Sequence, residues 1–193
     1  MNPITHALTG WCLAEAIPNV TTREKALITV AAIAPDVDGL GIFAELATRD
    51  SARPLLWWTD YHHLLGHNLL FAIAASLLAA LVARTARATT AACVFIAVHL
   101  HILGDLAGSR GPDGYQWPIP YLYPLDAPPL AWSGQWRLNA WPNIALTVAL
   151  LAITMFLAWK RGYSIVGLLS QRADRAFVDA LRLRVRRSFC SHG

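Results

Sequence analysis

Long apolar blocks separated by short polar stretches dominate the sequence. Three strong blocks cover residues 68–83, 88–104 and 142–159 and contain 16 to 18 residues each. As α-helices they are about 24 to 27 Å long, near the lower limit for crossing the hydrocarbon core of a bilayer. Two weaker blocks, residues 3–17 and 24–34, carry more polar side chains. They predict shorter helices packed inside the same bundle.

Two polar stretches between the blocks have recognisable patterns. Thr21-Thr-Arg-Glu24 has the spacing of a capping box and predicts the start of the second weak helix. Residues 106–141 form a long connection rich in Pro, Gly and Trp. A loop of this length is usually either functional or disordered, and its aromatic content argues against disorder.

The composition agrees with a membrane protein. Of the 193 residues, 55% are hydrophobic and only 15% are charged, and the mean hydropathy is +0.40. These values exclude an ordinary soluble domain of this size, because the apolar residues occur in blocks that a small core could not bury. We therefore predict an all-α integral membrane helical bundle with about three strong transmembrane helices, two shorter N-terminal helices and a C-terminal amphipathic helix.

The positive charge of the chain is concentrated in its tail. The formal net charge is +4, and from Lys160 onward there are eight Lys and Arg but only two Asp. A basic helix that follows an apolar segment is typical of a membrane-surface helix, so we expect membrane lipids rather than nucleic acid as its partner. The sequence thus divides into a membrane-embedded domain, residues 1–162, and a basic amphipathic tail, residues 163–193.

Basic residues also predict the orientation of the bundle. They occur at three connections, as the pairs Arg23 and Lys25, Arg84 and Arg87, and Lys160 and Arg161. The positive-inside rule places all three connections and the basic tail in the cytoplasm. The opposite ends of the helices then face outward.

Histidine and aspartate gather at these outward ends. The candidates, from four separate pieces of sequence, are His6, Asp36, Asp38, His62, His63, His67, His101 and Asp105. Ionisable groups at the edge of a bilayer are costly and usually functional. Imidazole and carboxylate together form the ligand set of hydrolytic transition-metal sites, so the pattern predicts a metal centre at the outer face.

Local spacing indicates which of these side chains point the same way. His101 and Asp105 are four residues apart on a predicted helix and project from one face. His99 lies about 200° around the helix from His101 and is expected to point elsewhere. The segment Pro35-Asp-Val-Asp-Gly39 predicts a turn that presents two carboxylates close together, one of which could bridge two cations.

The histidine-rich segment admits two arrangements. A continuous helix through Tyr61-His-His-Leu-Leu-Gly-His67 aligns His63 with His67. Pairing His62 with His67 instead requires a break, which Gly66 and an N-cap at Asn68 could supply. Helical spacing alone favours His63.

In this order the motifs resemble the YdjM-like family of bacterial inner-membrane metal-dependent hydrolases, which is distantly similar to zinc-dependent phospholipase C. The matching motifs are Thr5-His6, Pro35-Asp36-Val37-Asp38, His62 with His67, His101-x-x-x-Asp105 and Trp117-Pro118. The resemblance covers residues 1 to about 120. It implies metal ligands at His6, Asp36, Asp38, His62, His67, His101 and Asp105.

The chain departs from the family pattern around the histidine pair. His63 stands where the family commonly has Arg, Gly66 where it has Thr, and Asn68 where it has Ser. The direct ligand from this segment is therefore either His62 or His63, and the departure marks a possible subgroup with a different substrate.

These observations predict a membrane-bound metal-dependent hydrolase in the bacterial inner membrane, with its site on the outer face. One or two divalent cations are expected, Zn²⁺ before Mn²⁺ or Fe²⁺. The candidate catalytic residues are Asp36, Asp38 and His63, with a carboxylate outside the metal shell as general base. An interfacial site beneath an aromatic loop favours a phosphoester or ester of a lipid or lipid-linked substrate.

A divalent-cation transporter or a non-enzymatic metal-binding membrane protein is the alternative. A transporter needs a polar route to the inner face, whereas the inner halves of the apolar blocks show only Glu15 and a few Thr. Arg53, Arg110 and Arg137 on the outer side could clamp an anionic substrate or be ordinary loop charges. Six of the eight Trp also lie on that side, which an interfacial aromatic belt explains. They are Trp57, Trp58, Trp117, Trp132, Trp136 and Trp141.

Overall fold

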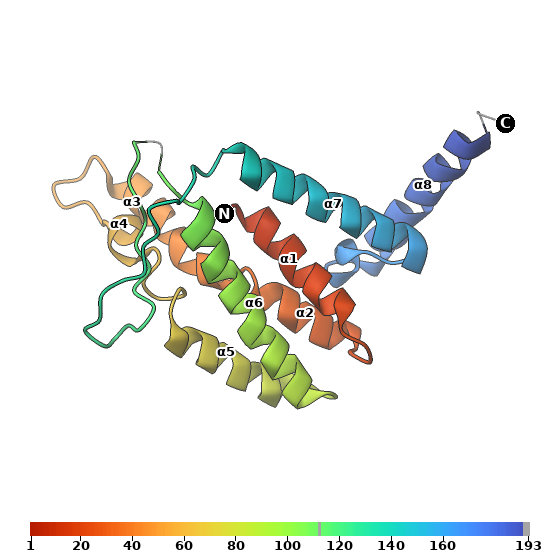
Figure 1. The fold of residues 1–193 in the computed structure, drawn as a ribbon, viewed down its shortest axis with the longest axis horizontal. Helices are drawn as coiled ribbons and strands as arrows, with labels where there is room; N and C mark the ends of the chain where they lie inside the picture. Colours follow the sequence, from red (N-terminus) through yellow and green to blue (C-terminus); the bar gives the residue numbers. More distant parts are fainter. Residues whose placement is uncertain (112, 191–193) are drawn as a thin grey trace.

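The protein is all-helical in the computed structural model, which describes residues 1–111 and 113–190. These residues contain eight α-helices and two short 3₁₀ helices (η), with no β-strand among them (Figure 1). In chain order they are α1 (Pro3–Ala16), α2 (Thr22–Ala31), η1 (Ala34–Leu40), α3 (Gly41–Thr48), α4 (Trp57–Tyr61), α5 (Leu69–Val82), α6 (Arg87–Gly108), α7 (Trp141–Arg161), η2 (Ile165–Leu168) and α8 (Gln171–Cys190). The predicted fold class is confirmed.

Helix α6 lies at the centre of the bundle. It packs against α1, α2 and α5, while α7 packs along α1 on the outside of the bundle (Figure 1). Small residues allow close approach: a Cβ on Gly10 of α1 would lie 2.5 Å from the Cβ of Ala32, beside α2. The core is rich in Ala and Val, including the fully buried Ala97 and Val98 of α6.

Two helices, α6 and α7, are long and apolar enough to cross a membrane. A third candidate span is a bent pair, in which α2 and residues 34–48 meet at 49°. The predicted span 68–83 is helical, but α5 has 14 residues and is only about 21 Å long. It begins at Leu69, where the Asn68 side chain accepts a hydrogen bond from the N–H of Phe71 and caps the helix.

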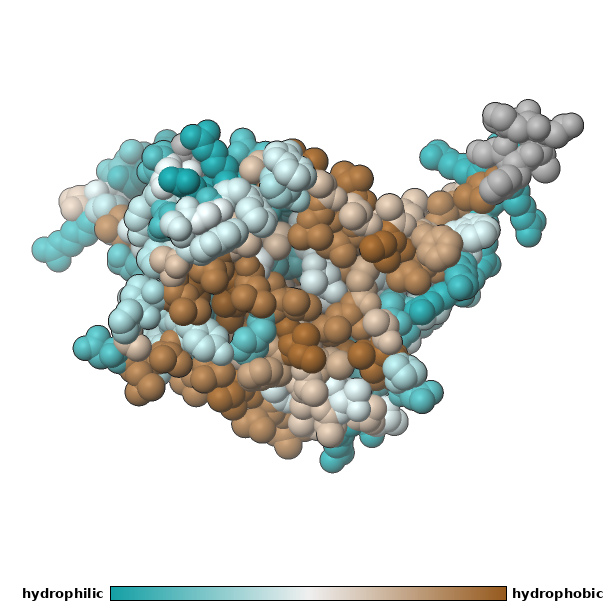
Figure 2. Space-filling view, viewed as in Figure 1, coloured by the Kyte–Doolittle hydropathy of each residue, from teal (hydrophilic) through white to brown (hydrophobic). Residues whose placement is uncertain are grey.

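Apolar side chains cover the outside of the bundle. Figure 2 shows a brown band over the helices, between hydrophilic loops on the left and the basic tail on the right. Helix α7 is less buried than α6 and exposes side chains such as Trp141, Val148 and Phe156. A surface of this kind suits lipid tails rather than water.

Buried carboxylates join the helices at the end that carries the predicted inner connections. Glu24 is fully buried and accepts hydrogen bonds from the backbone N–H groups of Thr21, Arg84 and Thr85. The predicted capping box is therefore confirmed, and it also fastens the connection between α5 and α6 to α2. Glu15 of α1 similarly pairs with Lys25 of α2 and with Arg161 at the end of α7.

The long connection between α6 and α7 folds over the outer end of α6. Asn143 donates hydrogen bonds from Nδ2 to the carbonyl oxygens of Gly108 and Leu138, at 2.8 and 2.9 Å. Gln135 donates from Nε2 to the carbonyl oxygen of Asp105 at 2.9 Å. These bonds hold the aromatic loop against the part of α6 that carries the candidate ligands.

The tail contains η2 and α8, and both lie at the C-terminal end of α1, away from the aromatic loop (Figure 1). The backbone N–H and hydroxyl of Ser164 donate to Oδ1 of Asp174, which fixes η2 to the first turns of α8. The amphipathic segment expected from Ile165 onward is thus divided into a 3₁₀ turn and a separate helix that begins at Gln171. The boundary between a membrane domain at 1–162 and a tail at 163–193 stays a prediction.

Candidate metal centre

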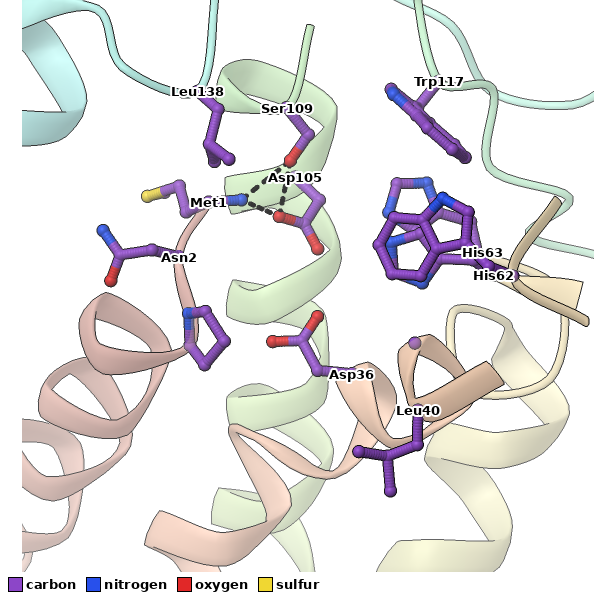
Figure 3. A pocket seen from close by; sticks show the side chains of 13 residues that line it. Met1, Asn2, Asp36, Leu40, His62, His63, Asp105, Ser109, Trp117 and Leu138 are labelled. Atoms are coloured by element: carbon purple, nitrogen blue, oxygen red, sulfur yellow. Dashed lines mark hydrogen bonds and ion pairs between the residues drawn. The ribbon is translucent and has the colours of Figure 1, made fainter. Parts of the chain in front are cut away.

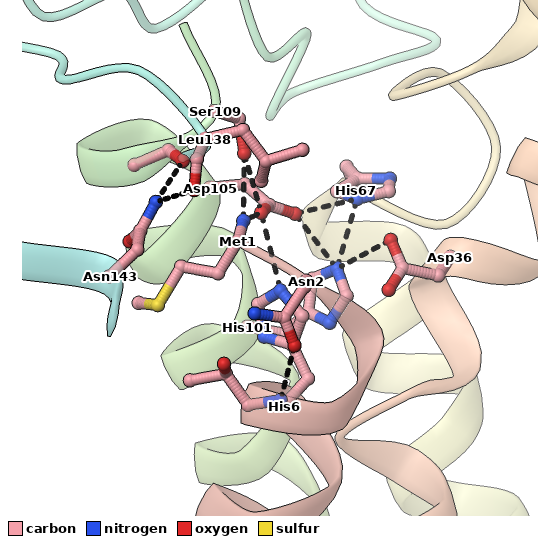
Figure 4. Close-up of polar contacts among 12 residues, drawn as sticks. Met1, Asn2, His6, Asp36, His67, His101, Asp105, Ser109, Leu138 and Asn143 are labelled. Carbon is pink, nitrogen blue, oxygen red and sulfur yellow. Dashed lines mark hydrogen bonds and ion pairs between the residues drawn. The ribbon is translucent and has the colours of Figure 1, made fainter. Parts of the chain in front are cut away.

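Four side chains from three parts of the chain converge beneath the aromatic loop. Asp36 comes from η1, His67 from the segment before α5, and His101 and Asp105 from adjacent turns of α6. One ligand atom from each lies within 4.8 Å of the other three (Figure 4). His67, His101 and Asp105 are almost completely buried, and Asp36 is half-buried. This group could hold a metal ion.

The ring of His101 is oriented by the backbone. Its Nδ1 lies 2.8 Å from the carbonyl oxygen of Ala32, which can only accept a hydrogen bond. Nδ1 must therefore carry the proton, and a neutral ring then presents a lone pair at Nε2. Nε2 lies 3.0 Å from Oδ2 of Asp105 and 3.6 Å from Oδ1 of Asp36.

The ring of His67 is oriented by a carboxylate. Its Nδ1 lies 3.2 Å from Oδ2 of Asp38, while its Nε2 lies 3.3 Å from Oδ2 of Asp105. If Nδ1 donates to Asp38, Nε2 presents a lone pair toward the same point as Nε2 of His101. An imidazole held through its far nitrogen by a carboxylate or carbonyl oxygen is the usual arrangement of a metal-bound histidine.

The electrostatics of this group favour a bound cation. The Nε2 atoms of His67 and His101 are 3.1 Å apart and both face the Asp105 carboxylate. Oδ2 of Asp36 is buried and has no hydrogen-bond partner. The positive charge nearest to the group is the amino group of Met1, which donates to Oδ1 of Asp105. Buried carboxylates beside imidazole lone pairs fit a divalent cation by charge and by ligand type.

The loop before α5 reaches the group because of a glycine. A Cβ on Gly66 would lie 2.4 Å from the carbonyl oxygen of Pro35, so the loop lies closer to η1 than a side chain at this position allows without a shift. The backbone N–H of Gly66 also donates to Oδ2 of Asp38 at 3.1 Å. The close approach sets His67, next in the chain to Gly66, beside Asp36, next to Pro35.

Of the remaining implied ligands, His6 lies at the edge of the group. Its Nε2 is 3.2 Å from Oδ1 of Asp105, and its ring stacks on His101 with centroids 3.7 Å apart. Asp38 and His62 lie behind His67 and are not members of the four-residue group. Nδ1 of His62 is 3.0 Å from Oδ1 of Asp38. Asp38 thus connects His62 and His67, using one oxygen for each ring.

His63 is not a member of the four-residue group, although its ring lies against that of His67 with centroids 4.4 Å apart. The helix α4 ends at Tyr61, so the chain has the break that a pairing of His62 and His67 requires, and His63 adopts a left-handed backbone conformation with φ of 69°. Its ring is buried, and its Nδ1 has no hydrogen-bond partner. Burial away from water, with smaller effects of the His67 and His62 rings, lowers the pKa of His63 to about 2.

A cavity of about 360 Å³ adjoins the group (Figure 3). Asp36, Asp105, His62 and His63 lie in its wall. The rest of the wall is mainly apolar, with Leu40, Trp58, Trp117 and Leu138. A molecule in this cavity would therefore meet the carboxylates on one side and an apolar, aromatic surface on the other.

Three residues in this wall were not recognised as site residues from the sequence. Trp58 stacks on His62 with ring centroids 3.9 Å apart, and Trp117 lies edge-on to the same ring. Both had been explained as part of an interfacial belt. Ser109 donates from its hydroxyl to Oδ1 of Asp105 at 2.8 Å. Its position four residues after Asp105 was the signal that could have identified it.

Several polar residues of the outer side do not reach the cavity. Arg53, Arg110 and Arg137 are absent from its wall, and Arg110 donates from Nε to the carbonyl oxygen of Gly114. His99 points away from the group, as its helix position predicts. Its ring nitrogens lie 2.7 Å from the carbonyl oxygen of Phe95 and 2.9 Å from the hydroxyl of Tyr121.

A comparison with protein families gives the same family as the order of the motifs along the chain. The model of the YdjM inner membrane protein family matches residues 1–171. This chain belongs to the YdjM family. The match includes every candidate ligand and extends to the first residue of α8, so the YdjM region continues well beyond residue 120, where the motifs end. Searches of curated proteins and of solved structures give no match.

Proposed function

We propose that this YdjM family protein is a membrane-bound metal-dependent hydrolase. The observation that carries the proposal is that the Nε2 atoms of His67 and His101 and the carboxylates of Asp36 and Asp105 meet at the wall of a cavity. When bound, a divalent cation supplies the Lewis acidity that activates water and stabilises negative charge on an attacked phosphoryl or acyl oxygen.

The donor set suits Zn²⁺. Zn²⁺ accepts imidazole nitrogens and carboxylate oxygens as ligands and could take a water as a fifth ligand beside these four donors, and Mn²⁺ or Fe²⁺ can use the same donors. His6 and Asp38 lie close enough to extend the site toward a second ion. Rotation of His67 and His101 is prevented by Asp38 and by the carbonyl oxygen of Ala32, so their Nε2 atoms are set in place before a metal binds.

Asp36 is the candidate general base. Its Oδ1 faces His101, while its Oδ2 has no hydrogen-bond partner, and the residue lies in the cavity wall. A carboxylate so placed can accept a proton from a water molecule in the cavity. His63 lines the same cavity with a neutral ring and orients the substrate rather than the metal.

The cavity wall supports a lipid-like substrate. Trp58, Trp117 and Leu138 offer an apolar surface opposite the carboxylates, and Leu40 connects the cavity to α3, whose Phe43 is exposed. An ester that joins a polar group to a hydrocarbon chain matches both sides. We therefore propose a phosphoester or carboxylic ester of a lipid or lipid-linked molecule as the substrate class.

The outer face of the inner membrane is the proposed location of the reaction. The cavity lies at the end of the bundle opposite the connections that carry Arg23, Lys25, Arg84 and Arg87. The positive-inside rule places those connections in the cytoplasm.

The test is hydrolysis by the purified protein in lipid vesicles. After removal of metal with a chelator, we expect no hydrolysis of a panel of lipid phosphoesters and carboxylic esters, and recovery on addition of Zn²⁺, Mn²⁺ or Fe²⁺. Asp36→Asn is expected to lower the recovered rate by about 100-fold or more. His99→Gln, on the same helix as His101, is the matched control. Hydrolysis that ignores both the chelator and Asp36→Asn would contradict the proposal.

A cation transporter is the alternative outcome of the same preparation. It predicts metal flux across the vesicle membrane that His101→Ala abolishes, without hydrolysis of any ester. The fold favours the hydrolase, because α6 is packed with Val94, Ala97 and Val98 below the group, and all three are fully buried. The side chains of residues 94–98 offer a cation no ligand.

A further inference from the structure

A second cavity lies at the other end of α1. Its volume is about 330 Å³, and α1, α2 and the η2–α8 segment enclose it. The residues that matter are Trp11, Thr22, Lys25, Tyr163, Gln171 and Arg175. None of them belongs to the metal centre, and His6 and Trp11 lie on different turns of α1. The proposed hydrolase activity does not use this cavity.

The surroundings of the cavity are positively charged. Lys25 and Arg175 line it, and Arg161 lies close by on Glu15. Two carboxylates accompany these cations, Asp174 in the cavity wall and Glu15 behind Lys25, and both are already engaged. Glu15 pairs with both Lys25 and Arg161, and Asp174 accepts hydrogen bonds from Ser164. The Arg175 side chain is exposed and has no hydrogen bond or ion pair within the described residues. An excess of positive charge therefore faces the cavity.

A buried donor points to a missing acceptor. Trp11 is 2% exposed and lines the cavity, yet its indole N–H has no hydrogen-bond partner. An indole nitrogen can only donate, and a buried donor without an acceptor is costly, so natural proteins rarely leave one unpaired. An acceptor oxygen of a ligand that reached this N–H from the cavity would remove that cost.

Two helices begin at the same cavity. Thr22 is the first residue of α2 and Gln171 the first residue of α8, and both line it. The first N–H groups of a helix have no partner inside the helix and carry partial positive charge. At α2 the Thr21 side chain already accepts the N–H of Glu24, and at α8 the Ser170 hydroxyl accepts that of Ala173, so the N–H groups of the first two residues of each helix are the ones on offer. With Lys25, Arg175 and the Trp11 N–H, they make a set of donors and positive charges suited to an anion with several oxygens.

We propose that this cavity binds a phosphate group that carries net negative charge. The group comes either from the headgroup of an anionic membrane lipid or from a soluble phosphate compound. A lipid has a place for its acyl chains, because Leu169 before α8 is 92% exposed and Trp159 on α7 is exposed at the same end of the bundle. In the orientation that the basic connections predict, this cavity faces the inner leaflet.

Binding can be measured by titrating the full-length protein in a neutral detergent and following thermal unfolding. The probes are short-chain phosphatidylglycerol, short-chain phosphatidylcholine and inorganic phosphate. We expect stabilisation by phosphatidylglycerol that is at least about tenfold stronger, in apparent Kd, than by phosphatidylcholine. If inorganic phosphate stabilises as well as phosphatidylglycerol does, the source is a soluble phosphate and the cavity assignment stands.

Paired variants locate the binding. Arg175→Gln and Trp11→Phe are each expected to weaken the apparent Kd by about tenfold, because the first removes a positive charge and the second removes the indole donor. The matched controls are Arg172→Gln, one turn away on α8, and Trp141→Phe, an exposed tryptophan at the other end of α7. Both are expected to bind as the wild type does. Arg175 is exposed, so its variant keeps the unfolding temperature of the ligand-free protein.

Equal binding by Arg175→Gln and Arg172→Gln, or equal binding of the anionic and the zwitterionic lipid, would overturn the proposal. Metal content is measured in parallel and is expected to be unchanged in all four variants. The two proposals can therefore fail separately, because anion binding is measured by thermal unfolding and needs neither bound metal nor esterase activity.

Discussion

The Nε2 atoms of His67 and His101 lie 3.1 Å apart, while the Nδ1 atom of each ring is held by an oxygen acceptor. Two neutral rings so oriented would place two lone pairs against one another and against the Asp105 carboxylate. A cation bound between the two rings would be coordinated by both lone pairs, and the repulsion between them would be removed. The predictions for the metal centre rest on this relationship.

Removal of either imidazole is expected to abolish metal binding. His67→Ala and His101→Ala each delete one of two nitrogen ligands, so the metal content of protein purified in mild detergent is expected to fall from near one equivalent to about a tenth or less. Elemental analysis after incubation with Zn²⁺, Mn²⁺ and Fe²⁺ measures it. His99→Ala on the same helix is the control and keeps its metal. Wild-type protein that stays metal-free after these incubations would refute the centre.

Asp38 is expected to strengthen metal binding without being essential for it. Its carboxylate holds His62 and His67 by their Nδ1 atoms, and loss of such a partner typically weakens metal affinity by about 10- to 100-fold. Competition with a fluorescent chelator gives the affinity of Asp38→Ala. Asp36→Ala, which removes a member of the four-residue group, is the comparison and is expected to lose more. An affinity of Asp38→Ala equal to that of the wild type would show that His67 needs no such support.

Gly66→Ala is expected to damage the centre without changing a ligand. The new Cβ would meet the backbone of Pro35 at 2.4 Å, so the loop with His67 must move away from η1 with Asp36. We expect metal content to fall at least about tenfold while the helical circular dichroism is kept. Leu65→Ala, at the exposed neighbouring position, is the control. Full metal content in Gly66→Ala would mean that the loop tolerates the displacement.

The orientation of the bundle can be tested with an impermeant thiol reagent. In a Cys190→Ser background, a cysteine at Ser133 in the aromatic loop is expected to react in intact cells, since the positive-inside rule places that loop outside. A cysteine at Arg172 is expected to react only after the cells are opened. Cys12 and Cys93, half-buried and buried, set the background. The opposite labelling pattern would place the metal centre in the cytoplasm.

The sequence pattern alone determined where the long helices lie and which residues are most of the candidate metal ligands. The apolar blocks 88–104 and 142–159 became α6 and α7 because burial of long apolar runs dictates helices whatever their neighbours are. The pairing of His101 with Asp105 followed from a local rule, since side chains four residues apart share a helix face. The family resemblance named the same motifs, and the YdjM match over residues 1–171 confirms it.

Only the tertiary structure decided how these residues divide their roles. Which nitrogen of His67 faces Asp105, and which oxygen of Asp38 supports it, depends on how η1 packs against the loop around Gly66. His63 leaves the helical path with a positive φ, so helical spacing could not place it. Contacts between residues 30 to 70 positions apart are set by the packing of whole helices, and no local pattern along the chain records that packing.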